Sequence, residues 1–161
     1  MTTGIFCRPS CKSKLPKREN VIFINFLSEA EKYKLRPCKR CRPDLVNYNP
    51  NRELVVKIKK IYTEFYNKPD KIKSIINDVG VSSNTLMRSF KQFENMTQKQ
   101  YLTKIRIEKS KEYLIAENIS VLEIALNCGF ESLSNFYKSF KLLTGLTPSD
   151  FRNQNKEGRE K

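Results

Sequence analysis

Residues 121–151 read VLEIALNCGFESLSNFYKSFKLLTGLTPSDF, and this stretch decides the fold of most of the chain. Apolar side chains recur every three or four positions on both sides of Gly129, which predicts two helices separated by a glycine turn. A short helix, a turn glycine and a second helix are the sequence form of a helix-turn-helix motif.

The same pattern occurs once earlier in the chain. Phe90-Lys91 returns as Phe140-Lys141 and Thr97 returns as Thr147, both after 50 residues. Upstream the interval is 49 residues, as between Gly80 and Gly129. The second copy therefore has one more residue in its turn or in the helix that follows. A difference of this kind is expected where only a surface turn is altered. The sequence therefore predicts two helix-turn-helix motifs in tandem.

The apolar pattern also places the other helices. We expect one at about 51–66, a short one around Ile72 to Ile76 closed by Gly80, and one that begins near Ser82 as its N-cap, with Leu86, Met87, Phe90 and Phe93 as its apolar side. A longer helix should run from Thr97 to about Ala116. At 1.5 Å per residue this helix spans ~30 Å, close to the ~34 Å between successive major grooves. A generic bundle of helical hairpins is the alternative.

The chain carries a large positive charge. It has 161 residues, with 31 Lys and Arg against 17 Asp and Glu, a formal charge of +14 and a pI of about 9.7. Residues 1–45 contain 11 basic and 4 acidic residues, and residues 46–161 contain 20 and 13, so each part contributes +7. Charge on both parts favours nucleic acid as the partner, because phosphate contacts need Lys and Arg. A merely solubilising surface is the alternative.

The sequence contains no histidine, which excludes a Ser-His-Asp triad, a Cys-His pair and a histidine general base. The N-terminus lacks the apolar core of a signal peptide. The most apolar stretch, residues 21–27, is far shorter than the ~20 residues that span a bilayer. We therefore expect a cytoplasmic protein with reduced cysteines and no membrane partner.

Four of the five cysteines form two close pairs, Cys7-x3-Cys11 and Cys38-x2-Cys41, separated by 26 residues. This spacing is typical of a zinc site with four thiolate ligands. Between the pairs we expect a strand at 21–26 and a short helix with a capping box of Ser28 and Glu31. The fifth cysteine, Cys128, is expected to be a small buried apolar residue. Such a site is ordinarily structural, but a thiolate held unprotonated by zinc is also a nucleophile.

The tandem motifs resemble the C-terminal DNA-binding domain of the AraC family. The residues that carry the resemblance are Gly80–Ser83, Arg88–Lys91, Ile124–Phe130, Asn135–Lys141 and Gly145–Arg152. The resemblance implies that the third and sixth helices enter the major groove. The candidate base-reading residues are then Ser83, Asn84, Thr85 and Arg88 in the first, and Ser132, Ser134, Asn135 and Lys138 in the second. Asn suits adenine and Arg suits guanine, whereas Lys more often contacts phosphate.

The N-terminal part looks like the zinc domain at the N-terminus of the Ada family. The matching stretches are TTGIFCRPSC at 2–11, RENV at 18–21 and RPCKRCRPD at 36–44. The resemblance implies that Cys7 accepts a methyl group irreversibly from a methylphosphotriester in DNA and that Cys7, Cys11, Cys38 and Cys41 hold one zinc ion. It places DNA contacts at Thr3, Lys12, Lys14 and Arg36. It also implies that residues 1–45 lack the N-terminal part of that domain.

Together these observations predict an α+β chain, in which a small four-cysteine zinc domain, a truncated α/β unit, precedes an all-α domain of two helix-turn-helix motifs joined by a long helix. The expected ranges are 1–45 for the zinc domain, 46–50 for a linker, 51–155 for the helical domain and 156–161 for a disordered tail. The expected function is a bacterial, nucleoid-associated sensor of DNA alkylation that becomes a transcriptional activator after methyl transfer. Its expected partners are double-stranded DNA and RNA polymerase, with the protein acting as a monomer. The alternatives are an AraC-type regulator with a purely structural zinc module and a thiol-based redox or metal sensor.

Overall fold

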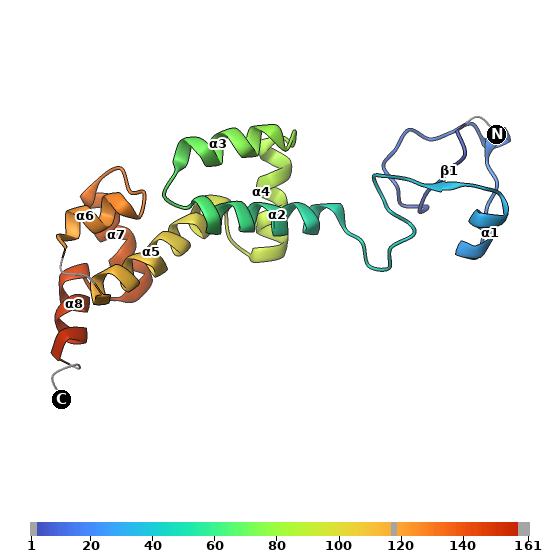
Figure 1. Ribbon diagram of the computed structural model, residues 1–161. Helices are drawn as coiled ribbons and strands as arrows, with labels where there is room; N and C mark the ends of the chain where they lie inside the picture. The colour runs from blue at the N-terminus through green and yellow to red at the C-terminus, as the bar shows by residue number, and fades with distance from the viewer. Residues whose placement is uncertain (1–2, 117–118, 158–161) are drawn as a thin grey trace. The chain divides into compact units, whose positions relative to one another are not determined.

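A computed structural model of the chain describes residues 3–116 and 119–157 (Figure 1). The chain divides into two compact units, residues 1–53 and 54–161. The elements of the first unit are β1 (Ile5–Phe6), a turn of 3-10 helix (Arg18–Asn20), α1 (Leu27–Lys32) and β2 (Arg36–Pro37). The helices that follow are α2 (Pro50–Phe65), α3 (Pro69–Asp78), α4 (Ser83–Glu94), α5 (Gln98–Ala116), α6 (Val121–Asn127), α7 (Leu133–Thr144) and α8 (Pro148–Glu157).

The two short strands of the first unit bring the cysteine pairs together. β1 and β2 are parallel, with Ile5 opposite Arg36 and Phe6 opposite Pro37. The backbone N–H of Cys38 donates to the carbonyl oxygen of Phe6 at 3.0 Å, which extends the ladder past the end of β2. In this register Cys7 and Cys38 leave the same end of the sheet.

Two local predictions for the first unit are wrong. Residues 21–26 form no strand, because no other strand of the described chain lies beside them, and Phe23 and Phe26 are 80% and 69% exposed. A short run of β-branched and aromatic residues is not sufficient for a strand without a partner to pair with. The capping box is also absent: the N-cap of α1 is Phe26, and Ser28 already lies inside the helix.

The first unit has almost no hydrophobic core. Among its described residues, the buried apolar side chains are Ala30 and Cys38. Larger apolar side chains of the same unit are exposed, namely Leu15, Ile22, Phe23, Phe26, Leu27, Tyr33, Leu45 and Val46. Apolar burial of this extent does not stabilise a unit of about 50 residues, so such a small unit needs covalent or metal cross-links.

The second unit contains the two predicted helix-turn-helix motifs, α3–α4 and α6–α7, and thereby confirms the tandem repeat. Both turn glycines have positive φ, +67° at Gly80 and +82° at Gly129, which is the left-handed region that glycine enters without penalty. Ser82 and Ser132 are the N-caps of α4 and α7, and each hydroxyl accepts from the backbone N–H three residues on. The first residues of α4 and α7 are 50 positions apart, and so are their last residues.

The range boundaries differ in detail from those expected from the sequence. α2 begins at Pro50, at the end of the expected linker, and α8 continues to Glu157, so residues 156 and 157 are helical. The remaining residues of the expected disordered tail, 158–161, lie outside the described residues. No helix in the part of the chain that the structure describes is both long and apolar enough to cross a membrane.

Each helix-turn-helix motif packs around its own core, and α5 takes part in both. The first core contains Val55, Ile58, Ile61, Tyr62, Ile72, Leu86 and Phe90. The second contains Ile107, Leu114, Ile124, Ala125, Cys128, Phe130, Phe136 and Phe140. Tyr101, Leu102 and Ile105 of α5 pack on the first core, whereas Ile107 and Leu114 belong to the second. Figure 1 shows α5 running from the group of α2, α3 and α4 to the group of α6, α7 and α8.

Because the cores are separate, we expect them to respond separately to mutation. Phe90 and Phe140 occupy equivalent positions and are both fully buried. Phe140→Ala should destabilise the second core by ~3–5 kcal/mol, and amide hydrogen exchange should accelerate in α6, α7 and α8 more than in α3 and α4. Phe90→Ala is the matched variant and should give the reverse pattern. Equal acceleration in both motifs for both variants would contradict two separate cores.

Candidate metal centre and DNA-binding surface

The four cysteines of the two pairs form one cluster. The Sγ atoms of Cys7, Cys11, Cys38 and Cys41 all lie within 4.8 Å of one another. A tetrahedral zinc ion with Zn–S bonds of ~2.3 Å places its sulfur ligands ~3.8 Å apart. The cluster therefore has the donor atoms and the spacing for one zinc ion, as the sequence predicted.

Tight turns after each strand supply the ligands in pairs. After β1, the N–H of Cys11 donates to the carbonyl oxygen of Arg8 at 2.9 Å. After β2, the N–H of Arg42 donates to the carbonyl oxygen of Cys38 at 2.9 Å. The N–H of Arg8 also donates to Cys41 Sγ at 3.4 Å, which joins the two turns across the cluster. Such N–H···S bonds favour the thiolate form of the cysteine.

The four thiols perturb one another strongly. Desolvation of the Cys7 sulfur, which faces the cluster, raises the pKa of Cys7 to about 12, and hydrogen bonds to Cys38 and Cys11 add to the effect. Backbone N–H groups of Cys41 and Arg40 lower the pKa of Cys38 to about 6. A thiolate at one position thus opposes ionisation at the others. Four thiolates at this spacing need a cation among them, which is the condition that zinc satisfies.

The four cysteines differ in exposure. Cys7 is exposed, Cys11 and Cys41 are partly exposed, and Cys38 is buried. Cys7 is therefore the member of the cluster most open to a large partner such as DNA.

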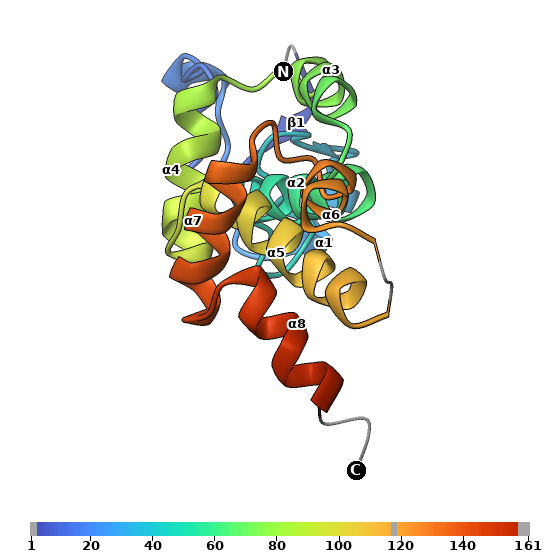
Figure 2. The ribbon, with the colours of Figure 1, turned by 90° about the vertical axis from the view of Figure 1, so that its left-hand side faces the viewer.

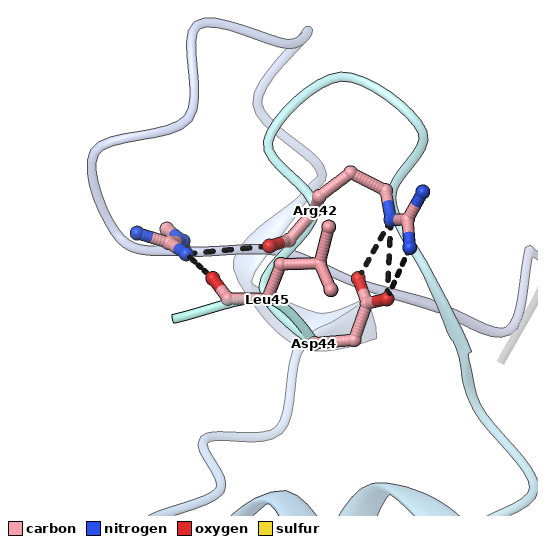
Figure 3. Close-up of polar contacts among 4 residues, drawn as sticks. Arg42, Asp44 and Leu45 are labelled. Atoms are coloured by element: carbon pink, nitrogen blue, oxygen red, sulfur yellow. Dashed lines mark hydrogen bonds and ion pairs between the residues drawn. The ribbon is translucent and has the colours of Figure 1, made fainter. Parts of the chain in front are cut away.

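A second set of contacts fastens the chain that follows Cys41. The guanidinium group of Arg8 donates to the carbonyl oxygens of Arg42, at 3.3 Å, and of Leu45. The guanidinium of Arg42 forms a two-point ion pair with Asp44 at 2.8–3.1 Å (Figure 3) and thereby lowers the pKa of that carboxyl. The residue after Cys7 is thus tied to the residues after Cys41. No local pattern in the sequence indicates the two bonds of Arg8, because they join positions 34 and 37 residues apart.

The zinc-domain residues proposed to contact DNA are all on the surface. Thr3, Lys12, Lys14 and Arg36 are exposed, and none of these cations has an ion pair within the described part of the chain. Thr3 lies just before β1, and Arg36 lies on β2 with its N–H bonded to the carbonyl oxygen of Gly4 at 2.8 Å. The guanidinium of Arg40 donates to the carbonyl oxygen of Lys12 at 2.6 Å, which fixes the backbone there.

The two candidate recognition helices present polar side chains to solvent. Ser83, Asn84, Thr85 and Arg88 of α4 are exposed, and so are Ser134, Asn135 and Lys138 of α7. Ser132 is exposed too, but its hydroxyl caps α7 by accepting from the N–H of Asn135 at 3.3 Å. Figure 2 shows α4 and α7 on the same side of α5. This arrangement is the one a joint reading of two grooves requires.

Met87 lies on the exposed side of α4. The apolar pattern placed it in the core with Leu86 and Phe90, but Met87 is 48% exposed while those two are buried. It lies on α4 between Asn84 and Arg88, among the candidate base-reading residues. An apolar side chain there suits the methyl group of thymine.

Comparison with known proteins matches both units. The family model described as "Metal binding domain of Ada" matches residues 1–44, and the one described as "Helix-turn-helix domain" matches residues 75–154. The chain is 34% identical over 155 residues to the "Bifunctional transcriptional activator/DNA repair enzyme AdaA" of Bacillus subtilis, covering 96% of this chain and 73% of that protein.

Two further matches differ in extent. The "Bifunctional transcriptional activator/DNA repair enzyme Ada" of Escherichia coli is 35% identical over 152 residues, which cover 94% of this chain but 42% of that protein. Among solved structures, the C-terminal domain of AraT, a response regulator from Geobacillus stearothermophilus, superposes with a TM-score of 0.59 at 26% identity. The superposition covers 68% of this chain and 88% of the other.

We expect removal of the metal to unfold the first unit and spare the second. With Ala30 and Cys38 as the buried apolar residues of the first unit, its structure depends on metal binding. After chelation, the amide resonances of residues 3–45 should collapse to random-coil shifts in ¹H–¹⁵N NMR spectra, while those of α2 to α8 stay in place. Cys11→Ser should lose the metal in the same way, and Cys128→Ala should keep one zinc per chain. Native shifts for residues 3–45 without metal would refute this expectation.

Proposed function

Because the chain belongs to the family of the bifunctional transcriptional activator and DNA repair enzyme AdaA, we propose that it removes the methyl group from methylphosphotriesters in DNA by transferring it to Cys7, once per molecule. The methylated protein is a stronger DNA binder and a transcriptional activator. The observation that carries the proposal is the exposure of Cys7 in a cluster whose other three members are partly or fully buried.

The transfer is a displacement at the methyl carbon. Cys7 Sγ attacks that carbon, a new S–C bond forms, and the bond between carbon and phosphate oxygen breaks. The electron pair of the broken bond stays on the phosphate, which regains its negative charge, and Cys7 becomes a neutral thioether. Zinc, when bound, supplies a thiolate at Cys7 without any general base. The chain has no histidine that could act as one.

The cations around the cluster are suited to hold the damaged backbone in place. The proposed contacts are Thr3, Lys12, Lys14 and Arg36, all exposed. Unpaired Lys and Arg bind the phosphates on either side of the neutral phosphotriester and fix its methyl group near Cys7. Orientation of this kind is a contribution to the rate that is separate from the ionisation of Cys7, which the metal would provide.

Methylation also acts as a switch through charge. A zinc ion with four thiolates has a net charge of −2, and conversion of one thiolate to a thioether leaves −1. At an effective dielectric constant of ~20, one charge ~8 Å from a phosphate is worth ~2 kcal/mol before salt screening. Loss of this repulsion strengthens DNA binding on the order of tenfold or more. The helix-turn-helix motifs direct the added affinity to a promoter.

The base-reading residues we propose follow from exposure and hydrogen-bond type. Asn84 and Asn135 suit adenine and Arg88 suits guanine, whereas Lys138 suits phosphate. Ser83, Thr85, Ser132 and Ser134 contribute further contacts to bases or phosphates. Because one chain carries both motifs, a monomer suffices, acting at the bacterial nucleoid with RNA polymerase as its partner.

Mass spectrometry tests the transfer. Zinc-loaded protein incubated with DNA that carries methylphosphotriesters should gain 14 Da on the peptide containing Cys7, one methyl per chain, with the other cysteines unmodified. The same DNA without methylation is the control for the substrate, and Cys128→Ala is the control for thiol number. No methyl on Cys7 in folded, zinc-loaded protein would favour a structural zinc module. A gain of oxygen in place of methyl, with loss of zinc, would favour a thiol-based sensor.

Base substitutions in selected DNA test the recognition helices. With duplexes selected by the protein itself from a random library, Asn135→Ala should lose ~1–3 kcal/mol of discrimination at one base pair and leave the salt dependence unchanged. Lys138→Ala should instead weaken binding to all sequences and reduce the slope of log K against log salt by about one. If Asn135→Ala weakened every sequence equally, its assignment to a base edge would be wrong.

A further inference from the structure

We propose that a junction of Asn67, Arg106 and Gly129 sets the separation at which α4 and α7 read DNA. This inference rests on the proposed DNA-binding function of the two helices, and it assigns the residues that fix the spacing between the two half-sites. Arg106 and Gly129 are positioning residues here, because neither lies on α4 or α7.

The need for a junction follows from the two separate cores. The side chains of α5 that pack on the first core end at Ile105, and those of the second core begin at Ile107. The two motifs are joined by α5, and a helix can curve along its length. A contact between the motifs away from their cores therefore adds to what fixes the separation of α4 and α7.

Gly129 provides the first part of that contact. A Cβ atom at this position would lie 2.8 Å from the Cα of Asn67 and 3.1 Å from the carbonyl oxygen of Tyr66. Residues 66 and 67 lie in the loop that leads from α2 into α3, the first helix of the first motif, whereas Gly129 is the turn of the second motif. Only a glycine permits so close an approach of two backbones. Gly80, the equivalent turn glycine of the first motif, has no atom within 4 Å of the same position.

Arg106 provides the second part. Its Nε donates to the carbonyl oxygen of Tyr66 at 2.8 Å, and its guanidinium carbon lies 5.9 Å from the ring centroid of Phe130. Tyr66 follows α2, and Phe130 is a core residue of the second motif. Arg106 projects from α5 between Ile105 of one core and Ile107 of the other, so one side chain holds both motifs to the shared helix.

The junction lies near the middle of α5, but it affects the positions of α4 and α7, which contact the DNA. A rotation of the second motif about α5 would separate Gly129 from Asn67 and break the bond from Arg106 to Tyr66. The same rotation would move α7 around the DNA axis relative to α4. Successive base pairs are ~3.4 Å apart along the axis, with 10–10.5 per turn. A twist of a few tens of degrees therefore changes the preferred spacing by about one base pair.

The experiment measures spacing directly. The full zinc-loaded chain is used to select duplexes from a library with a randomised core of about three helical turns, and the distance between the two enriched sequence motifs is counted. The wild type should enrich a single spacing. The Arg106→Met and Gly129→Ala proteins should still enrich both DNA half-site sequences, but with at least two different spacings between them. Their affinity for the wild-type spacing should fall on the order of tenfold. Once α4 is bound, α7 is no longer held at the position of its own half-site, so its effective concentration there is lower.

Two matched variants separate positioning from stability. Arg152→Met removes a guanidinium that donates to the carbonyl oxygen of Ile119 at 2.7 Å, a bond within the second motif. Gly80→Ala strains the equivalent turn at φ +67° without meeting any neighbour. Both should lower the melting temperature and retain the single spacing. Enrichment of each half-site motif by every variant shows that its helices are folded.

The outcomes are distinct. A single unchanged spacing for Arg106→Met and Gly129→Ala overturns the inference while leaving the proposed function in place. Broadened spacing for Arg152→Met or Gly80→Ala as well would also overturn it, because any loss of stability would then have the same effect. Failure of the wild type to enrich paired sequences would overturn both the inference and the proposed reading of DNA by α4 and α7, whereas the transfer to Cys7 is decided by mass spectrometry.

Discussion

The mutual repulsion of four sulfurs within 4.8 Å is the constraint on which the first unit depends. Four thiolates at that spacing are stable around a divalent cation and around little else, as the opposite displacements of the Cys7 and Cys38 pKa values indicate. The unit has Ala30 and Cys38 as its buried apolar residues, so metal binding replaces the hydrophobic core that a unit of this size lacks. Under the proposed function, the cation that offsets this repulsion and so holds the fold together also keeps Cys7 ionised. Stability and reactivity have one source here.

The proposed function divides two tasks between the two units. The first unit recognises damage in the phosphate backbone, which carries no sequence information, and the second reads bases, which carry no information about damage. Binding energy is the quantity common to both, because each unit contributes cations that contact the same polyanion. A change of one charge at Cys7 therefore adds to whatever affinity the helix-turn-helix motifs already have. No conformational change between the units is required for the signal to pass.

Local patterns predicted the parts of the fold that local interactions determine. The helices α2 to α7, the two glycine turns and the cap Ser82 follow from periodicity and from hydrogen bonds that span three or four residues. The strand expected at 21–26 failed because a strand needs a partner elsewhere in the chain, and Met87 was misplaced because its exposure depends on packing around α4. The grouping of the four cysteines was predictable from their spacing, whereas the bonds of Arg8 and Arg106 were not. These bonds join residues 37 and 40 positions apart, and no local rule relates them.

Four unpredicted contacts made by arginine share a chemical form that suits binding to DNA. Arg8, Arg40, Arg106 and Arg152 each donate to a backbone carbonyl oxygen far along the chain, rather than to a carboxylate. A guanidinium offers five donors in a rigid plane, so it can cross-link distant backbone segments at a geometry that lysine does not hold. A carbonyl acceptor leaves the positive charge uncompensated, whereas an ion pair would remove one unit of it. In a chain whose partner is a polyanion, arginine-to-carbonyl bonds therefore stabilise the fold without reducing the +14 charge that attracts the DNA.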